Sequence, residues 1–126
     1  MKTCYLIEDD IDDHDIFRMS LEGIDKTIKC DVAGNGDDAV QRLNAEAGYT
    51  PDYIFIDVNM PKMNGIECLK QLKKLSRLNG TQIIMFSTSE EPRVIRQCKQ
   101  LGANDFVVKP ASLDSLSLIL SKIIKS

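Results

Sequence analysis

The chain has 126 residues, which is close to the commonest size of one globular domain and long enough to bury a hydrophobic core. Its net charge of −3 does not fit the basic surfaces that bind nucleic acids or membranes. The first apolar run is far shorter than a signal-peptide core, and no run approaches the roughly 20 residues that span a bilayer. We therefore expect one cytoplasmic domain, residues 1–126, that binds neither nucleic acid nor membrane.

Five short apolar runs, rich in Ile, Val and aromatic residues, predict β-strands. They lie at residues 3–7, 27–32, 52–56, 81–86 and 105–108. The last three runs are almost continuously apolar, as in parallel strands that are covered on both faces.

Helical spacing of apolar residues occurs between the predicted strands and after the last one. Val40 and Leu43 mark the second helix, which has the weaker pattern, and Gly102 is in position to end the fourth. The last helix is marked by Leu113, Leu116, Leu120, Ile123 and Ile124. The alternation predicts an α/β fold of the (βα)5 type: an open, doubly wound, five-stranded parallel sheet with helices on both faces.

Polar residues of four kinds stand where the apolar runs end. Glu8 and Asp9 follow the first run, Asp57 follows the third, Ser87 the fourth and Lys109 the fifth. In open parallel sheets, ligands bind beyond the carboxyl ends of the strands. We therefore expect these side chains to meet at one edge of the sheet.

The carboxylates at that edge predict a metal site, because clustered like charges are costly unless a cation neutralises them. Oxygen ligands with no nearby His or Cys favour Mg²⁺. The expected ligands are Glu8, Asp9, Asp57 and the backbone carbonyl of Asn59, which lies in the turn after the third strand. The alternative for Asp9 and Asp10 is capping of the following helix.

Asp57 is the candidate nucleophile, since a carboxylate can attack phosphorus when a metal relieves the charge repulsion. Ser87 can donate to a phosphoryl oxygen, and Lys109 can pair with Asp57 and then with phosphate. Taken singly, Asp57 also suits a strand-end residue bonded to loop amides, and Ser87 an ordinary loop residue. Because Pro110 follows Lys109, the bond between them is a candidate for a cis peptide in a tight turn.

Other reactive residue types have ordinary interpretations. Asp12, Asp13 and Asp15 suit a solvated first helical turn, and the single histidine, His14, suits a surface position better than a metal or phosphoryl site. The four cysteines lack zinc spacing and suit reduced, mostly buried thiols. They are Cys4, Cys30, Cys68 and Cys98, of which the first two could lie on neighbouring strands.

Four motifs in order carry a resemblance that covers essentially the whole chain. They are I-E-D-D at 7–10, I-D-V-N-M-P-K-M-N-G at 56–65, M-F-S-T-S at 85–89 and F-V-V-K-P at 106–110. With them the chain resembles the CheY-like receiver domains of two-component response regulators. The resemblance implies the strand order 2-1-3-4-5 and a stand-alone receiver domain without an output domain.

The resemblance also implies roles for the strand-end residues. Asp57 would accept a phosphoryl group from the phosphohistidine of a sensor histidine kinase or a histidine phosphotransfer protein, with Mg²⁺ as cofactor. Ser87 and Lys109 would hold the phosphoryl group. Phe106 matches the family's switch aromatic, although it also suits a core position on the last strand. Asn59 and Ser89 match positions that tune dephosphorylation.

The expected function is a phosphorylation-controlled switch rather than an enzyme. Phosphorylation would change the surface of the fourth helix, fifth strand and fifth helix, and so control a downstream protein partner. The chain would be a monomer or a phosphorylation-dependent dimer.

Three rival functions are open to the sequence. A small aspartyl-phosphate phosphohydrolase commonly needs an acid two residues after the nucleophile, where this chain has Asn59. A flavodoxin-like FMN carrier needs hydroxyls and glycine amides after the first strand, where this chain has acids. A pseudo-receiver would bind partners without phosphorylation, against which stands the intact set of site residues.

Overall fold

The computed structural model describes residues 2–124 and contains one sheet of five parallel strands. The order across the sheet is β2-β1-β3-β4-β5, as the resemblance implies. The strands are β1 (Thr3–Ile7), β2 (Lys29–Ala33), β3 (Tyr53–Asp57), β4 (Gln82–Ser87) and β5 (Asp105–Val108).

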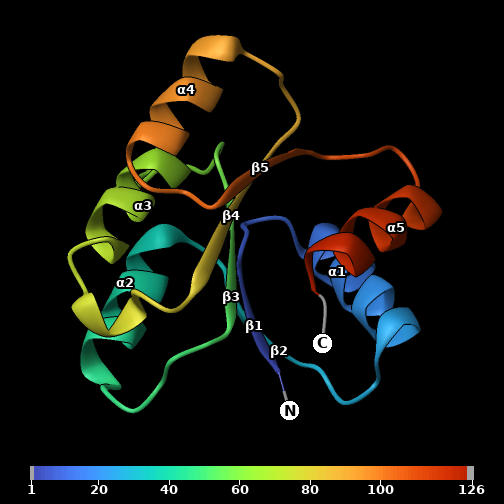
Figure 1. The fold of residues 1–126 in the computed structure, drawn as a ribbon, viewed down its shortest axis with the longest axis horizontal. Coiled ribbons are helices and arrows are strands. Elements are labelled where there is room, and N and C mark those ends of the chain that lie inside the picture. Colours follow the sequence, from blue (N-terminus) through green and yellow to red (C-terminus); the bar gives the residue numbers. More distant parts are fainter. Residues whose placement is uncertain (1, 125–126) are drawn as a thin grey trace.

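Helices cover both faces of the sheet, which confirms the doubly wound (βα)5 prediction. In Figure 1, α1 and α5 lie on one side of the strands, and α2, α3 and α4 lie on the other. None of the helices within residues 2–124 is long and apolar enough to cross a membrane. The helices are α1 (Ile11–Ile24), α2 (Gly36–Ala45), α3 (Gly65–Leu72), α4 (Pro92–Gln100) and α5 (Leu113–Ile123), with a 3-10 turn, η1 (Ser76–Leu78), that was not predicted.

The predicted strand boundaries are shifted by one or two residues in three strands. β3 and β4 each continue one residue further, because Asp57 pairs with Phe86 and Ser87 pairs with Val108 in the sheet. β2 begins two residues later than predicted, because the backbone and hydroxyl of Thr27 are held in a turn. Backbone pairing, and not the apolar run alone, sets where a strand ends.

The two faces of the sheet carry separate hydrophobic cores. On β3, Ile54 and Ile56 point into the core under α2 and α3, while Tyr53 and Phe55 point into the core under α1 and α5. All five residues of β3 are buried. This central strand therefore fixes Asp57, its last residue, within the rigid part of the fold.

The cysteines are reduced and mostly buried, as predicted. Cys4 and Cys30 are direct register partners on β1 and β2, and burial raises the pKa of both thiols, to about 12 and about 11. Thiols with raised pKa values are poor nucleophiles at neutral pH.

Gly102 ends α4 as predicted. It follows the C-cap residue Leu101 and has φ +99°, a left-handed conformation that glycine adopts without a steric penalty. A Cβ atom at this position would also lie 2.7 Å from Cε of Lys73.

The prediction of a cis peptide bond between Lys109 and Pro110 is wrong. Every peptide bond within residues 2–124 is trans. The amide of Lys109 donates to the carbonyl of Ser87 (2.7 Å) and so continues the strand pairing. The chain bends only at residues 111–112, before α5, so the X-Pro bond itself does not have to form the turn.

Candidate functional site

The carboxyl ends of β1 and β3, which are neighbours in the sheet, bring three carboxylates together. One oxygen each from Glu8, Asp9 and Asp57 lies within 4.8 Å of the others. The side chains of Glu8 and Asp57 are buried, with 3% and 6% exposed, and Asp9 is exposed. These three oxygen donors, open to solvent on one side, suit a hard divalent cation such as Mg²⁺.

Asp10 caps α1. This contact decides between helix capping and metal binding, the two roles that the sequence left open for Asp9 and Asp10. Its Oδ1 accepts hydrogen bonds from the amides of Asp12 (2.9 Å) and Asp13 (3.4 Å). The cap fixes the start of α1 directly after the carboxylate cluster. Asp9 is therefore left for the candidate metal site while Asp10 satisfies the helix end.

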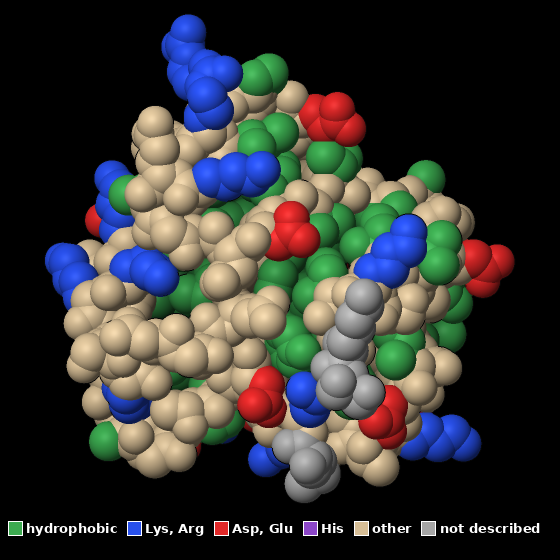
Figure 2. All heavy atoms as spheres, in the orientation of Figure 1, with side chains coloured by type: hydrophobic (Ala, Val, Ile, Leu, Met, Phe, Trp, Pro, Cys, Tyr) green, Lys and Arg blue, Asp and Glu red, His purple; other side chains and the backbone are tan. Residues whose placement is uncertain are grey.

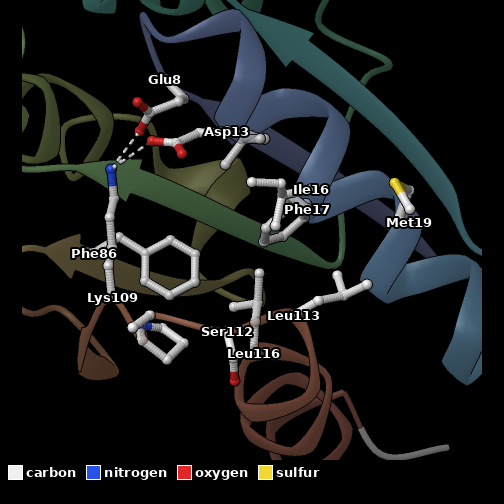
Figure 3. Close-up of a pocket in the computed structure, with 13 residues that line it drawn as sticks. Glu8, Asp13, Ile16, Phe17, Met19, Phe86, Lys109, Ser112, Leu113 and Leu116 are labelled. Atoms are coloured by element: carbon white, nitrogen blue, oxygen red, sulfur yellow. Dashed lines mark hydrogen bonds and ion pairs between the residues drawn. The ribbon is translucent and has the colours of Figure 1, made fainter.

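Lys109 joins the strand ends through its ammonium group. Its Nζ lies 3.0 Å from Glu8 Oε2, 3.3 Å from Asp13 Oδ2 and 3.5 Å from Asp57 Oδ1. Figure 3 shows the side chain of Lys109 extending toward Glu8 and Asp13, with dashed lines to both. The prediction that Lys109 pairs with Asp57 is confirmed, and the structure adds two further acidic partners.

The electrostatics of this cluster leave negative charge in excess. Burial raises the pKa of Glu8, an effect that the hydrogen bond from Lys109 offsets only in part and that the charge of Asp57 adds to. Burial disfavours the charged form of Lys109, but its hydrogen bond to Glu8 and the charges of the surrounding acids together outweigh burial and raise its pKa. One ammonium thus faces several carboxylates, and a divalent cation would complete the balance.

The hydroxyl of Ser87 lies at the end of β4, where the sequence predicts it. Ser87 is 2% exposed, and its Oγ accepts a hydrogen bond from the amide of Ser89 (3.1 Å). Thr88, the neighbouring hydroxyl residue, is exposed. Among these adjacent hydroxyls, Ser87 is the one that the sheet holds in place.

The loop from β3 to α3 depends on Gly65. Its amide donates to the carbonyl of Val58 (2.9 Å), and a Cβ atom here would lie 2.7 Å from Val58 Cα. Only glycine permits this close approach beside Asp57. The same loop places the amide of Asn59 as a donor to Asp57 Oδ1 (3.1 Å) and holds Lys62 at φ 67°. The role of the Asn59 carbonyl as a metal ligand stays a prediction.

Phe106 lies outside the carboxylate cluster. It pairs with Met85 across β4 and β5, is half-buried, and packs against the core under α2 and α3. Its position between core and solvent is compatible with both a switch and a core role, so the switch role stays a prediction.

Asp13 is the site residue that the sequence interpretation missed. Interpreted as part of a solvated turn, it in fact reaches Lys109 from α1, whereas Asp12 and Asp15 are exposed as expected. Helical spacing carries the signal, because Asp13 precedes the buried Phe17 by four residues and so shares its sheet-facing side. His14 is half-buried, with Nε2 at hydrogen-bonding distance from the carbonyl of Glu8.

Comparison with known proteins agrees with the geometry. The chain matches the response regulator receiver domain family over residues 5–121. It is 31% identical over 118 residues to the chemotaxis protein CheY of Thermotoga maritima, covering 91% of this chain and 94% of that protein. The structure of Vibrio cholerae CheY4 superposes with a TM-score of 0.83 at 27% identity, covering 98% of this chain and 99% of the other. The phosphorylated cyanobacterial phytochrome response regulator RcpA gives 0.85 at 26% identity, covering 97% and 90%.

Some relatives are much longer than this chain. It is 41% identical over 88 residues to a protein-glutamate methylesterase/protein-glutamine glutaminase of Treponema denticola, which is 70% of this chain but 23% of that protein. It covers 14% of the sensory/regulatory protein RpfC of Xanthomonas campestris. The activities of those whole proteins therefore do not transfer to this chain. By its motifs, its 2-1-3-4-5 sheet and its acidic strand ends, the chain belongs to the response regulator receiver domains, the CheY-like signalling domains of two-component systems.

Proposed function

We propose that this domain is the phosphoacceptor switch of a two-component phosphorelay and that Asp57 receives the phosphoryl group. One observation carries the proposal: Asp57 is buried at the end of β3, with oxygens of Glu8 and Asp9 within 4.8 Å and the ammonium of Lys109 at 3.5 Å. A buried acid with both a cation partner and a cation-binding cluster suits the transfer of a highly charged group.

The transfer moves a phosphoryl group between two nucleophiles. An oxygen of Asp57 attacks the phosphorus of a phosphohistidine on a sensor histidine kinase or a histidine phosphotransfer protein. The new O–P bond forms as the N–P bond breaks. The electron pair of the N–P bond returns to the imidazole nitrogen, which takes up a proton from solvent. Lys109 neutralises the charge on the phosphoryl oxygens, and the hydroxyl of Ser87 donates to one of them.

Mg²⁺ is the proposed cofactor, held by Glu8, Asp9, Asp57 and the Asn59 carbonyl. When bound, it would supply the positive charge that offsets repulsion between a carboxylate and a phosphoryl group. The donor set supports this choice, since it consists of oxygen atoms and contains two buried acids near a single ammonium.

The output is a change of protein surface. When Ser87 turns toward the phosphoryl group, the following loop moves and Phe106 turns inward, which alters the surface of α4, β5 and α5. Asn59 and Ser89 would tune the lifetime of the phosphoryl group. We place the switch in the cytoplasm, as a monomer or a phosphorylation-dependent dimer.

One part of the proposed output surface, α4, is basic. Figure 2 shows Lys and Arg side chains on the side of the molecule that α3 and α4 form. On α4, Arg93, Arg96 and Lys99 are exposed, and its nine residues include no acid. A downstream protein partner with an acidic surface would suit this helix.

The test uses beryllofluoride as a phosphoryl mimic. Wild-type protein with Mg²⁺ and beryllofluoride should show amide NMR shifts around Asp57, Ser87 and α4, and Asp57→Asn should show none. Beryllofluoride shifts that persist in Asp57→Asn would refute the acceptor assignment. If the wild-type protein shows no NMR shifts with Mg²⁺ and beryllofluoride, the phosphorylation-independent pseudo-receiver is favoured. Steady turnover of a phosphomonoester would favour the phosphohydrolase.

A further inference from the structure

Asp13 approaches the site from a different element than the other acids. It is the third residue of α1, and its Oδ2 accepts a hydrogen bond from Lys109 Nζ at 3.3 Å. Its side chain is 41% exposed, whereas that of Glu8 is 3% exposed. In Figure 3, Glu8 and Asp13 converge on the ammonium from above the strand ends.

Asp13 is not one of the three acids that form the candidate metal cluster, which are Glu8, Asp9 and Asp57. Its carboxylate contacts the ammonium of Lys109. The two other acids that contact Lys109 both belong to the cluster. Asp13 is therefore the partner of Lys109 that ligand binding would leave in place.

Lys109 has room to change its position. It lines a cavity of about 180 Å³ between α1 and α5, whose other lining residues include Asp13, Phe86 and Leu116. A lysine side chain is long and flexible, so packing alone does not fix its ammonium group beside an open cavity. The surrounding carboxylates determine where the ammonium lies.

We propose that Asp13 is a positioning residue for Lys109. When Glu8 is engaged by the metal, Asp13 retains the ammonium at the mouth of the site, where it can meet a phosphoryl group on Asp57. Without Asp13, Lys109 would rest on Glu8 and Asp57 and compete with the metal for their oxygens. This inference rests on the function proposed above.

The first experiment compares Asp13→Asn with Asp12→Asn. The two residues are adjacent acids in the first turn of α1, and Asp12 is exposed, so the substitutions make the same charge change in the same helix turn. Asp13→Asn should weaken the apparent affinities for Mg²⁺ and for beryllofluoride by roughly 3- to 10-fold, as expected for loss of a partly exposed ion pair. Asp12→Asn should change them by less than about 2-fold.

The second experiment repeats both substitutions in a Lys109→Met background. If Asp13 acts through Lys109, its excess effect over Asp12 should disappear there. Metal-free protein gives an independent measure, because urea unfolding should show coupling between positions 13 and 109, with unfolding constants that depart from additivity by about 2- to 5-fold. Positions 12 and 109 should be additive.

The outcomes separate the two proposals. If wild type binds beryllofluoride but Asp13→Asn behaves like Asp12→Asn, or if its effect survives in Lys109→Met, the positioning role is wrong and the proposed function stands. If wild type does not bind beryllofluoride with Mg²⁺, the proposed function fails and the positioning role fails with it, whatever coupling the metal-free protein shows.

Discussion

Two clusters of charged side chains in this chain are built in opposite ways. At the carboxyl ends of the strands, Lys109 faces Glu8, Asp13 and Asp57. The side chain of Asp9 lies beside those of Glu8 and Asp57. We call this the acidic site. Beside β2, Arg42 contacts Asp31 and Glu46 and lies over the rings of two tyrosines, Tyr5 and Tyr49. We call this the Arg42 cluster.

The Arg42 cluster satisfies its groups with each other. The hydroxyl of Tyr49 donates to Asp31 Oδ2 at 2.6 Å, and Arg42 Nε donates to Glu46 Oε2 at 2.8 Å. The guanidinium carbon of Arg42 lies 4.2 Å from the ring centre of Tyr49, within the range of a cation–π interaction. Hydrogen bonds, charge and stacking all act together to hold α2 and the following loop against β2.

The acidic site instead concentrates like charges around one cation. Such an arrangement costs stability unless a ligand completes it, and functional sites commonly carry that cost. The difference predicts opposite effects of removing an acid. In a charged cluster that stabilises the fold, the change should lower the free energy of unfolding of the protein. In a cluster that serves ligand binding, it should raise that free energy.

The largest expected effect is that of removing each cation. In metal-free protein near neutral pH, Lys109→Met should lower the free energy of unfolding by about 3 kcal/mol, because it leaves buried acids unpaired. Arg42→Met should lower it by only about 1–2 kcal/mol, since its acids are closer to solvent. Urea unfolding measures both, and an equal or smaller loss for Lys109→Met would contradict the comparison.

Removing one acid from each cluster should change the free energy of unfolding in opposite directions. Asp57→Asn should raise the free energy of unfolding by about 1 kcal/mol in the absence of metal, because it relieves repulsion with Glu8. Asp31→Asn should lower it by about 1–2 kcal/mol, because Tyr49 and Arg42 lose a charged partner. Thermal or urea unfolding is sufficient, and changes of the same sign in both variants would break the distinction.

The acidic site should also respond to pH in the acidic-to-neutral range. Burial raises the pKa of Glu8 in the folded protein above its ordinary value of 4.5, so the folded state holds a proton that the unfolded state releases. Stability of the metal-free protein should therefore fall as the pH rises from about 5 toward neutrality, with a contribution of about 1 kcal/mol from this group. Glu8→Gln should flatten this dependence of stability on pH. An equally steep decline in that variant would show that the dependence comes from another group.

The smallest effect is expected at high pH in the Arg42 cluster. Burial and the hydrogen bond to Asp31 raise the pKa of Tyr49, so its contribution is present below the ordinary tyrosine pKa and is lost as the pH rises above about 10. In Tyr49→Phe the fall in the free energy of unfolding at high pH should be smaller, by less than about 1 kcal/mol. Tyr53→Phe, on β3, serves as a control, and a matching change in that variant would show a general effect of alkali.

The acidic site was largely predictable from the sequence, because most of its residues directly follow apolar strand segments. Parallel strands bring their carboxyl ends to one edge, so the positions of Glu8, Asp9, Asp57 and Lys109 along the chain were enough to place them together. The capping role of Asp10 was likewise open to prediction, because it directly precedes α1.

The remaining features depend on geometry that spacing does not encode. The pair of Asp31 and Tyr49 is 18 residues apart and joins an edge strand to a loop, so no local pattern indicates it. Asp13 lies among several acids, and only the phase of α1 relative to the buried Phe17 distinguishes it from its neighbours. The cis prediction at Pro110 failed because the chain bends two residues later than a motif at a strand end suggests.

The central claim is that the acidic site is completed by a phosphoryl group on Asp57. The most direct measurement treats the protein with acetyl phosphate, with and without Mg²⁺, and maps the modified residue by mass spectrometry of peptides. We expect one phosphoryl group per chain, on Asp57, that forms only with Mg²⁺. Modification of another residue, or none on Asp57 while Mg²⁺ binds, would contradict it.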